Sequence, residues 1–318
     1  MSISSAPASW RQQVLLHWRM TRPAFLTITL TACLLGIASA ASCGCGLDVP
    51  AAMATVLLAC VAHAGANVLN DYHDSRNGAD AANEGRLHPF TGGARLIQQG
   101  VVSEPHTGRW AAVLLLVLVP TGLLLAARAG GGLLMIGAAG LFVAWAYSAP
   151  PLKLMSRGLG ELAVAAAWWG VVVGADYVQR HQFFIIPASL GFSLALLVAC
   201  ILLINGVPDA PADARVGKRT LAVRLGPRGT ALLYAWLALL AHAWLALSVW
   251  LLIPPAVALW GLLSLPLSLA AAALLWRHAA TPARLRPAIG LTIAAANLHG
   301  LALAAALAWH GWHINATL

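Results

Sequence analysis

The chain has 318 residues, of which 60% are hydrophobic and 9% are charged. A soluble globular protein carries about 25% charged residues, and the mean hydropathy here is +0.79. These values exclude a soluble globular protein. The formal net charge of +9 would suit nucleic acid. The basic residues instead follow a membrane topology, so we expect no nucleic-acid partner.

Long apolar runs divide the chain, and each suits a helix that crosses a bilayer, which needs about 20 residues. No clear cleavage site follows the first run, so we interpret it as a retained span rather than a signal peptide. We expect an all-α fold, a single domain over residues 1–318 with nine transmembrane helices around a central cavity. The runs cover residues 24–42, 50–71, 110–127, 132–149, 159–176, 183–205, 230–251, 255–276 and 287–309.

The basic residues indicate how this bundle is oriented. With nine spans, all but two of the 19 Lys and Arg residues fall on one side, and only Arg128 and Arg180 fall on the other. The positive-inside rule then predicts a cytoplasmic N-terminal segment over residues 1–22. The two longest loops lie on the same side, and we expect residues 72–109 and 206–229 to form cytoplasmic caps. We expect the membrane to be the plasma (inner) membrane.

Two polar motifs end apolar runs on that side. The first contains Asn67, Asn70, Asp71 and Asp74, with Asp80 shortly after. At about 100° of rotation per residue, Asn67, Asp71 and Asp74 share one helix face. Hard oxygen ligands of this kind suit Mg²⁺, which takes one or two carboxylates together with substrate phosphate oxygens. A solvated polar helix end is the alternative interpretation. Ionisable residues at membrane depth favour the functional one.

The second motif places Asn205, Asp209 and Asp213 at intervals of four residues. Pro208 and Pro211 interrupt it, and proline disfavours helix in its vicinity, so a kink or a stop near Val207 is expected.

Basic residues follow the second motif. Lys218 and Arg219 are candidates to bind a diphosphate, although the positive-inside signal alone also explains them.

A third cluster follows the fourth run. We expect Tyr147 to contact an aromatic acceptor or a phosphate, and Lys153 to contact the diphosphate. An interfacial tyrosine and a topogenic lysine are the alternatives. His63 lies one helical turn before Asn67, either on the cavity or at a helix interface. Cys43 and Cys45 are the only close pair of the five cysteines. We interpret them as small apolar filler, with a redox pair as the alternative.

These motifs resemble those of the UbiA-type intramembrane prenyltransferases. The resemblance extends from about residue 65 to residue 300, and paired Asp motifs with nine spans make it specific. The form of the first motif and the tail after the second are most similar to the 1,4-dihydroxy-2-naphthoate prenyltransferases, whereas Pro208 and Pro211 depart from the pattern. The matching segments are Asn70-Asp-Tyr-His-Asp74, Tyr147-Ser-Ala-Pro-Pro-Leu-Lys153, Gly158-Leu-Gly-Glu161, Asn205 to Asp213, Gly217-Lys-Arg-Thr220 and Asn297-Leu-His-Gly300.

The resemblance implies a chemistry and residues to carry it. Mg²⁺ would bind the four aspartates and a polyprenyl diphosphate, and an aromatic acceptor would attack the allylic cation within an apolar interior. Menaquinone synthesis is the implied pathway. Another acceptor such as 4-hydroxybenzoate, or a secondary transporter, are the alternatives. The catalytic set would be Asp71, Asp74, Asp209, Asp213 and Lys153, and the substrate-binding set Asn67, Asn70, Tyr147, Asn205, Lys218 and Arg219.

Overall fold

The computed structural model describes residues 9–44 and 46–317, with side chains up to residue 313. Over these residues the regular structure is entirely helical. Cys45 lies outside the described residues. The α-helices are α1 (Trp10–Met20), α2 (Leu26–Ala41), α3 (Val49–Asn77), α4 (Ala79–Ala82), α5 (Glu104–Ala129), α6 (Gly131–Ala146), α7 (Gly160–Arg180), α8 (Ile185–Arg215), α9 (Leu221–Trp250), α10 (Leu265–His278) and α11 (Arg286–Thr317). Short 3₁₀ segments are η1 (Pro23–Phe25), η2 (Leu154–Arg157), η3 (Ala256–Ser264) and η4 (Pro282–Arg284).

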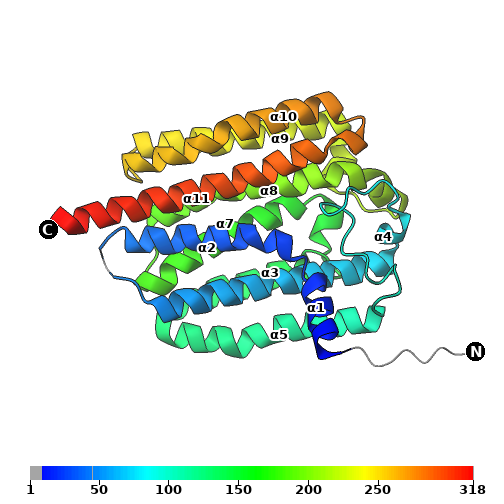
Figure 1. Ribbon diagram of the computed structural model, residues 1–318, viewed down its shortest axis with the longest axis horizontal. Coiled ribbons are helices and arrows are strands. Elements are labelled where there is room, and N and C mark those ends of the chain that lie inside the picture. Colours follow the sequence, from blue (N-terminus) through cyan, green and yellow to red (C-terminus); the bar gives the residue numbers. More distant parts are fainter. Residues whose placement is uncertain (1–8, 45, 318) are drawn as a thin grey trace, which may run out of the picture.

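The long helices run side by side between two ends of an elongated bundle (Figure 1). Within the described residues, eight segments are long and apolar enough to cross a membrane. The helix α6 occupies the place of a ninth span but has only 16 residues, about 24 Å at the helical rise. The chain is therefore a polytopic all-α membrane protein. The helix α1 and the end of α11 lie at opposite ends of the bundle (Figure 1).

The helix α8 forms the centre of the bundle. It packs against α7 and α9 along most of its length, contacts α2 and α11, and is the most deeply buried of the spans. Among the outcomes expected from Pro208 and Pro211, a stop near Val207 is wrong. The helix continues to Arg215 with both prolines inside it. Each proline removes one helical hydrogen bond, and burial of Val207, Pro208 and Ala212 among neighbouring helices keeps the segment helical.

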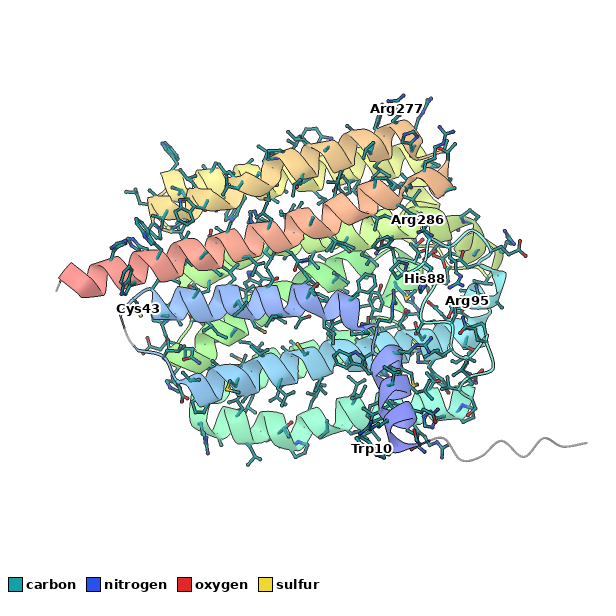
Figure 2. The ribbon with its side chains drawn as sticks, in the orientation of Figure 1. Trp10, Cys43, His88, Arg95, Arg277 and Arg286 are labelled. Carbon is teal, nitrogen blue, oxygen red and sulfur yellow. The ribbon has the colours of Figure 1, made fainter. Side chains whose placement is uncertain are left out.

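The helix α3 also continues beyond its apolar run, to Asn77. It ends at Gly78, whose φ of +83° gives the left-handed C-terminal cap that glycine adopts without strain. The polar ends of α3 and α8 therefore project together from the same end of the bundle, and the short helix α4 packs on both. In Figure 2, Arg95, Arg277, Arg286 and His88 lie at this end, whereas Cys43 lies at the other.

Polar side chains buried among the last helices satisfy one another. His299 contacts Ser193 through Nε2 at 2.8 Å and Ser264 through Nδ1 at 3.1 Å. His242 contacts Ser264 through Nε2 at 2.9 Å. Such a network offsets the cost of placing polar groups at membrane depth. These histidines tie α8, α9 and α11 together, away from the polar motifs.

Candidate active site

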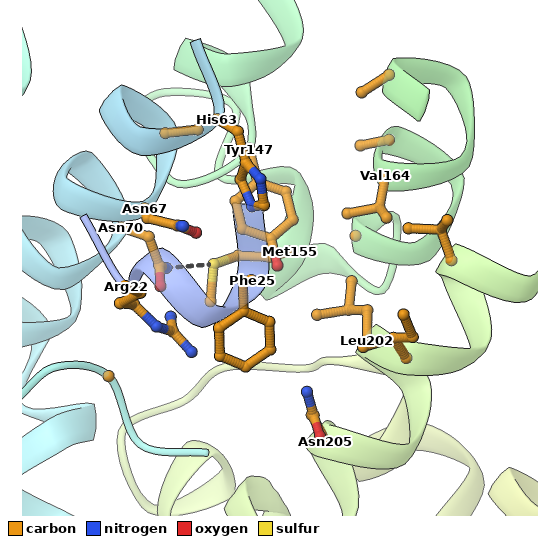
Figure 3. A pocket seen from close by; sticks show the side chains of 18 of the residues that line it. Arg22, Phe25, His63, Asn67, Asn70, Tyr147, Met155, Val164, Leu202 and Asn205 are labelled. Atoms are coloured by element: carbon orange, nitrogen blue, oxygen red, sulfur yellow. Dashed lines mark hydrogen bonds between the residues drawn. The ribbon is translucent and has the colours of Figure 1, made fainter. Parts of the chain in front are cut away.

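A cavity of about 310 Å³ opens between α2, α3, α6, α7 and α8. One part is polar and is formed by the ends of α3 and α8 with the loop after α4. The other part is apolar and is lined by side chains such as Val164 and Leu202 (Figure 3). Asn67, Asn70 and Tyr147 project into the space between these parts (Figure 3). The cavity thus joins a charged compartment to an apolar one.

The two aspartates of the first motif have different partners. Asp74 lines the cavity, and its carboxylate accepts hydrogen bonds from Asn70 at 3.1 Å and from Lys218 at 3.0 Å. The carboxylate of Asp71 is bound instead by the loop after α4, where the amide of Ala94 donates to Oδ2 at 3.0 Å. Its Oδ1 lies 3.9 Å from Nη1 of Arg22 and accepts no hydrogen bond.

The segment from Asn83 to Ala94, called here the glycine loop, reaches both motifs. Nδ2 of Asn83 donates to Asp209 at 2.6 Å, and the amide of Gly92 donates to the other oxygen of Asp209 at 3.3 Å. Gly93 has φ +66°, and a Cβ there would lie 2.8 Å from Oδ1 of Asp71. The glycine therefore allows the backbone to approach this carboxylate.

Lys218 joins the two motifs. Its ammonium is buried and lies 3.0 Å from Asp74 and 3.1 Å from Asp213. Burial lowers the pKa of Lys218, but the charges of Asp74 and Asp213 outweigh burial and raise the pKa above its usual value. The lysine is therefore charged and neutralises one carboxylate from each motif.

Asp80 is buried, lines the cavity and lies close to the first motif. Burial raises its pKa to about 8, and the charges of Asp74 and Asp71 add to the increase, whereas Lys218 and Arg22 oppose it. Nε2 of Gln98 donates to it at 3.4 Å.

The remaining polar positions fall into two groups. Asn67 donates to the carbonyl of Thr21 at 3.1 Å, and Asn70 also contacts Sδ of Met155 at 3.1 Å (Figure 3). Tyr147 and Asn205 line the cavity. Burial raises the pKa of Tyr147, which keeps its phenol protonated. Lys153 and Arg219 are exposed and are not among the cavity-lining residues.

Comparisons with known proteins decide what kind of protein has this site. Residues 29–294 match the UbiA prenyltransferase family. The chain belongs to the UbiA prenyltransferase family. It is therefore an integral membrane enzyme that transfers prenyl groups.

Among relatives of this UbiA-family enzyme are two bacterial proteins named 1,4-dihydroxy-2-naphthoate octaprenyltransferase. The Mycobacterium tuberculosis protein is 34% identical over 65% of this chain and 68% of its own length. The Escherichia coli protein is 29% identical over 64% of this chain and 67% of its own length.

Solved structures of UbiA proteins share the fold. A UbiA homologue from Archaeoglobus fulgidus, bound to DMAPP and Mg²⁺, aligns with a TM-score of 0.59 at 16% identity, covering 95% of this chain and 99% of the other. A structure of digeranylgeranylglyceryl phosphate synthase aligns with a TM-score of 0.60 at 15% identity, covering 93% and 98%. At these identities the likeness establishes the architecture of the UbiA bundle.

The residues of this UbiA site also allow a test of whether a divalent cation fits. Two buried oxygens, Oδ1 of Asp71 and Oδ1 of Asn205, accept no hydrogen bond, which is unusual for buried polar atoms. In the described residues, no three His, Cys, Asp or Glu side chains are arranged to hold an ion by themselves. Mg²⁺ usually keeps waters and takes further ligands from substrate phosphates, so it can bind with one or two protein carboxylates. The donor set fits.

Sequence reasoning missed several residues at the UbiA site. Asn83, Gly92 and Ala94 act partly through backbone amides, which any residue type supplies, so only the paired glycines of the loop signalled them. Arg22 lies before the first span and looked like a topogenic residue. Trp168 also lines the cavity, where the ring of His63 packs against it at 4.8 Å between ring centroids.

Proposed function

We propose that this enzyme is a Mg²⁺-dependent prenyltransferase that joins a polyprenyl group from polyprenyl diphosphate to 1,4-dihydroxy-2-naphthoate. One observation carries the proposal: Asp74, Asp209 and Asp213, which come from two distant segments, line an apolar cavity together with Lys218. Asp71 adjoins this set through Arg22, which also lines the cavity. The names of the bacterial relatives support the acceptor. The DMAPP and Mg²⁺ in the archaeal homologue support the donor class and the metal.

Each part of the cavity has a task in this reaction. Asp71, Asp74, Asp209 and Asp213 hold the cation, which when bound neutralises the charge of the diphosphate. Lys218 and Arg22 lie beside these carboxylates and bind diphosphate oxygens. Asn70 and Asn205 supply further polar contacts. The apolar wall around Trp168, Val164 and Leu202 holds the prenyl chain and excludes water.

The bond changes follow from this arrangement. The carbon–oxygen bond of the allylic diphosphate breaks, and the electron pair leaves with the diphosphate at the charged end. The ring carbon that bears the carboxylate attacks the allylic carbon. The acceptor then loses its carboxylate as carbon dioxide, which restores the aromatic ring. Tyr147, protonated and on the cavity, is placed to donate a hydrogen bond to the acceptor.

The location of the reaction is also part of the proposal. With nine spans, all but two of the 19 Lys and Arg residues fall on the same side as the two carboxylate motifs. The positive-inside rule therefore favours a cytoplasmic active site in the plasma membrane, with residues 1–22 on the same side and α6 as a ninth crossing. The polar segments 72–109 and 206–229 then lie over the site.

The test is a product analysis. Membranes containing the enzyme are incubated with Mg²⁺, a labelled prenyl diphosphate, and either 1,4-dihydroxy-2-naphthoate or 4-hydroxybenzoate. We expect a labelled lipid from the naphthoate, and the Asp71→Ala and Asp209→Ala variants should lose it by at least about 100-fold while remaining in the membrane. A labelled product from 4-hydroxybenzoate but not from the naphthoate would contradict the proposed acceptor. Uptake into sealed vesicles without a covalent product would indicate a transporter.

A further inference from the structure

The helix α1 differs from every other long helix of the bundle. It has 11 residues and lies across α3 and α5 rather than along them (Figure 1). Trp10, Val14 and Trp18 follow at intervals of four residues on its outer side, and their exposed fractions are 71%, 60% and 54%. Leu15 adjoins them. The helix therefore has an apolar outer line although it is too short to span a bilayer.

The inner side of α1 already has its partners. Leu16 and Met20 pack with Val68 of α3 and with Leu114 of α5. Nε2 of His17 lies 3.1 Å from Nε2 of His106, which lies in the first turn of α5. These contacts fix which side of the helix faces outward, so the apolar outer line is left without a partner in the described chain.

The depth of α1 identifies what covers that line. The helix α3 begins at Val49, at the far end of the bundle, and Val68, which packs against α1, lies 19 residues further. At 1.5 Å per residue this separation is about 29 Å, close to the hydrocarbon thickness of about 30 Å. If Val49 marks one boundary of the hydrocarbon, α1 lies at the other, between lipid tails and headgroups.

The charge of α1 suits such a position. Arg11 and Arg19 are exposed, and the guanidinium of Arg11 lies over the ring of Trp10 at 5.5 Å. Helices that lie in the membrane interface combine Trp and Leu on one side with Arg or Lys nearby, and basic side chains at this level attract anionic lipids. We propose that α1 binds anionic phospholipid headgroups through Arg11 and Arg19 while Trp10, Val14 and Trp18 enter the lipid.

This helix is also attached to the candidate active site. The carbonyl of Thr21, its C-terminal cap, accepts the hydrogen bond from Asn67. Arg22 follows in a left-handed conformation, with φ +56°, and lines the cavity beside Asp71. Anionic lipid that binds α1 therefore also restrains Arg22 and Asn67, because both are connected to the C-terminal end of this helix. This second consequence rests on the proposed function; the lipid binding does not.

The experiment compares nanodiscs of phosphatidylcholine with nanodiscs that also contain phosphatidylglycerol. Hydrogen–deuterium exchange over residues 10–20 measures how firmly α1 is held. We expect slower exchange with phosphatidylglycerol, and each of Arg11→Gln and Arg19→Gln should reduce that difference by about fivefold, the effect of one basic side chain near an anionic surface. Trp10→Ser with Trp18→Ser should accelerate exchange in both lipids.

The matched control is Arg277→Gln with Arg284→Gln, which removes two exposed arginines at the same end of the bundle, outside α1. It should retain the full lipid effect. Equal exchange in both lipids, or an equal loss in this control, would overturn the proposal, as would protection that requires two enzyme copies per nanodisc.

Steady-state kinetics of prenyl transfer are measured in the same nanodisc samples. The KM for the prenyl diphosphate should fall with phosphatidylglycerol and rise in Arg11→Gln, with kcat unchanged. An unchanged KM would remove the link to the site. If no transfer activity is found at all, the exchange measurement still decides whether α1 binds lipid, so the failures of the two proposals are distinguishable.

Discussion

The four aspartates divide into two pairs that cut across the two motifs. Asp74 and Asp213, the lysine-linked pair, share the ammonium of Lys218. Asp71 and Asp209, the loop-held pair, accept hydrogen bonds from the glycine loop. Each pair takes one residue from α3 and one from α8. The first pair shares one ammonium, whereas in the second pair Asp71 faces Arg22 at 3.9 Å and Asp209 is bound by uncharged amides. Asp209 therefore retains more unbalanced negative charge for a cation than the other three.

Lys218→Met should have the largest effect, and it acts on the lysine-linked pair. It leaves two buried carboxylates without their cation, and breaking a buried ion pair in this way costs about 3–5 kcal/mol. Thermal unfolding of the purified enzyme in detergent measures the loss. The triple variant with Asp74→Asn and Asp213→Asn should recover most of it. An unfolding temperature equal to that of the wild type would show that Lys218 does not balance this pair.

Ligand removal tests the loop-held pair. The Mg²⁺ complex of a prenyl diphosphate, treated as one ligand at about a hundred times its Kd, should stabilise the enzyme by about 2.7 kcal/mol, and a chelator should reverse the gain. Asp71→Asn and Asp209→Asn should abolish this stabilisation because they remove carboxylates proposed to hold the cation. The same measurement of thermal unfolding applies. A full shift in either variant would place the cation elsewhere.

Asn83→Ala compares the pairs directly. Its side chain donates to Asp209 at 2.6 Å, and a hydrogen bond to a charged group contributes about 1.5–3 kcal/mol. Asn77→Ala is the matched control, because Asn77 donates to Asp74 at 3.1 Å while Lys218 still balances that carboxylate. We expect the Asn83 variant to lose more stability than the control. Equal losses would remove the distinction between the two pairs.

Gly93→Ala should have the smallest effect of the four. A residue other than glycine in the left-handed region costs about 1–2 kcal/mol, and the new methyl group would press on Asp71. We expect weaker Mg²⁺ dependence of transfer as the loop shifts away from the carboxylate. Gly100→Ala, with φ +70° and open space around it, carries the backbone cost alone. An identical Mg²⁺ dependence in the two variants would contradict a role for the close approach at Gly93.

The sequence predicted much of the architecture, and the roles of the carboxylates stay a prediction. Apolar runs located the spans because lipid forces long hydrophobic helices. The helix ends at Asn77 and Arg215 lay beyond those runs, because tertiary packing extends the helices past the apolar stretch. The stop expected from Pro208 failed for the same reason.

Contacts between distant segments were less visible. Lys218 was expected at the diphosphate, and its position between Asp74 and Asp213 depends on how α3 and α8 meet. The glycine loop contributes amides of Gly92 and Ala94, which carry no residue signature. Lys153 and Arg219 had the right charge for the site, but the turns that carry them direct them to the exterior. Residue type therefore predicted the kind of chemistry. The three-dimensional arrangement determines which charged side chains lie together in the candidate site.

The placement of α1 and the end of α11 at opposite ends of the bundle separates two kinds of access (Figure 1). A protein that recognised the final turns of α11 would meet the enzyme a full membrane thickness away from the carboxylates. It could influence the reaction only through the helices themselves. A partner that delivers the proposed acceptor, or removes diphosphate, would instead approach the end where α3, α4 and α8 meet. The bundle thus places the approach to the candidate active site on one face of the membrane and the exposed end of α11 on the other.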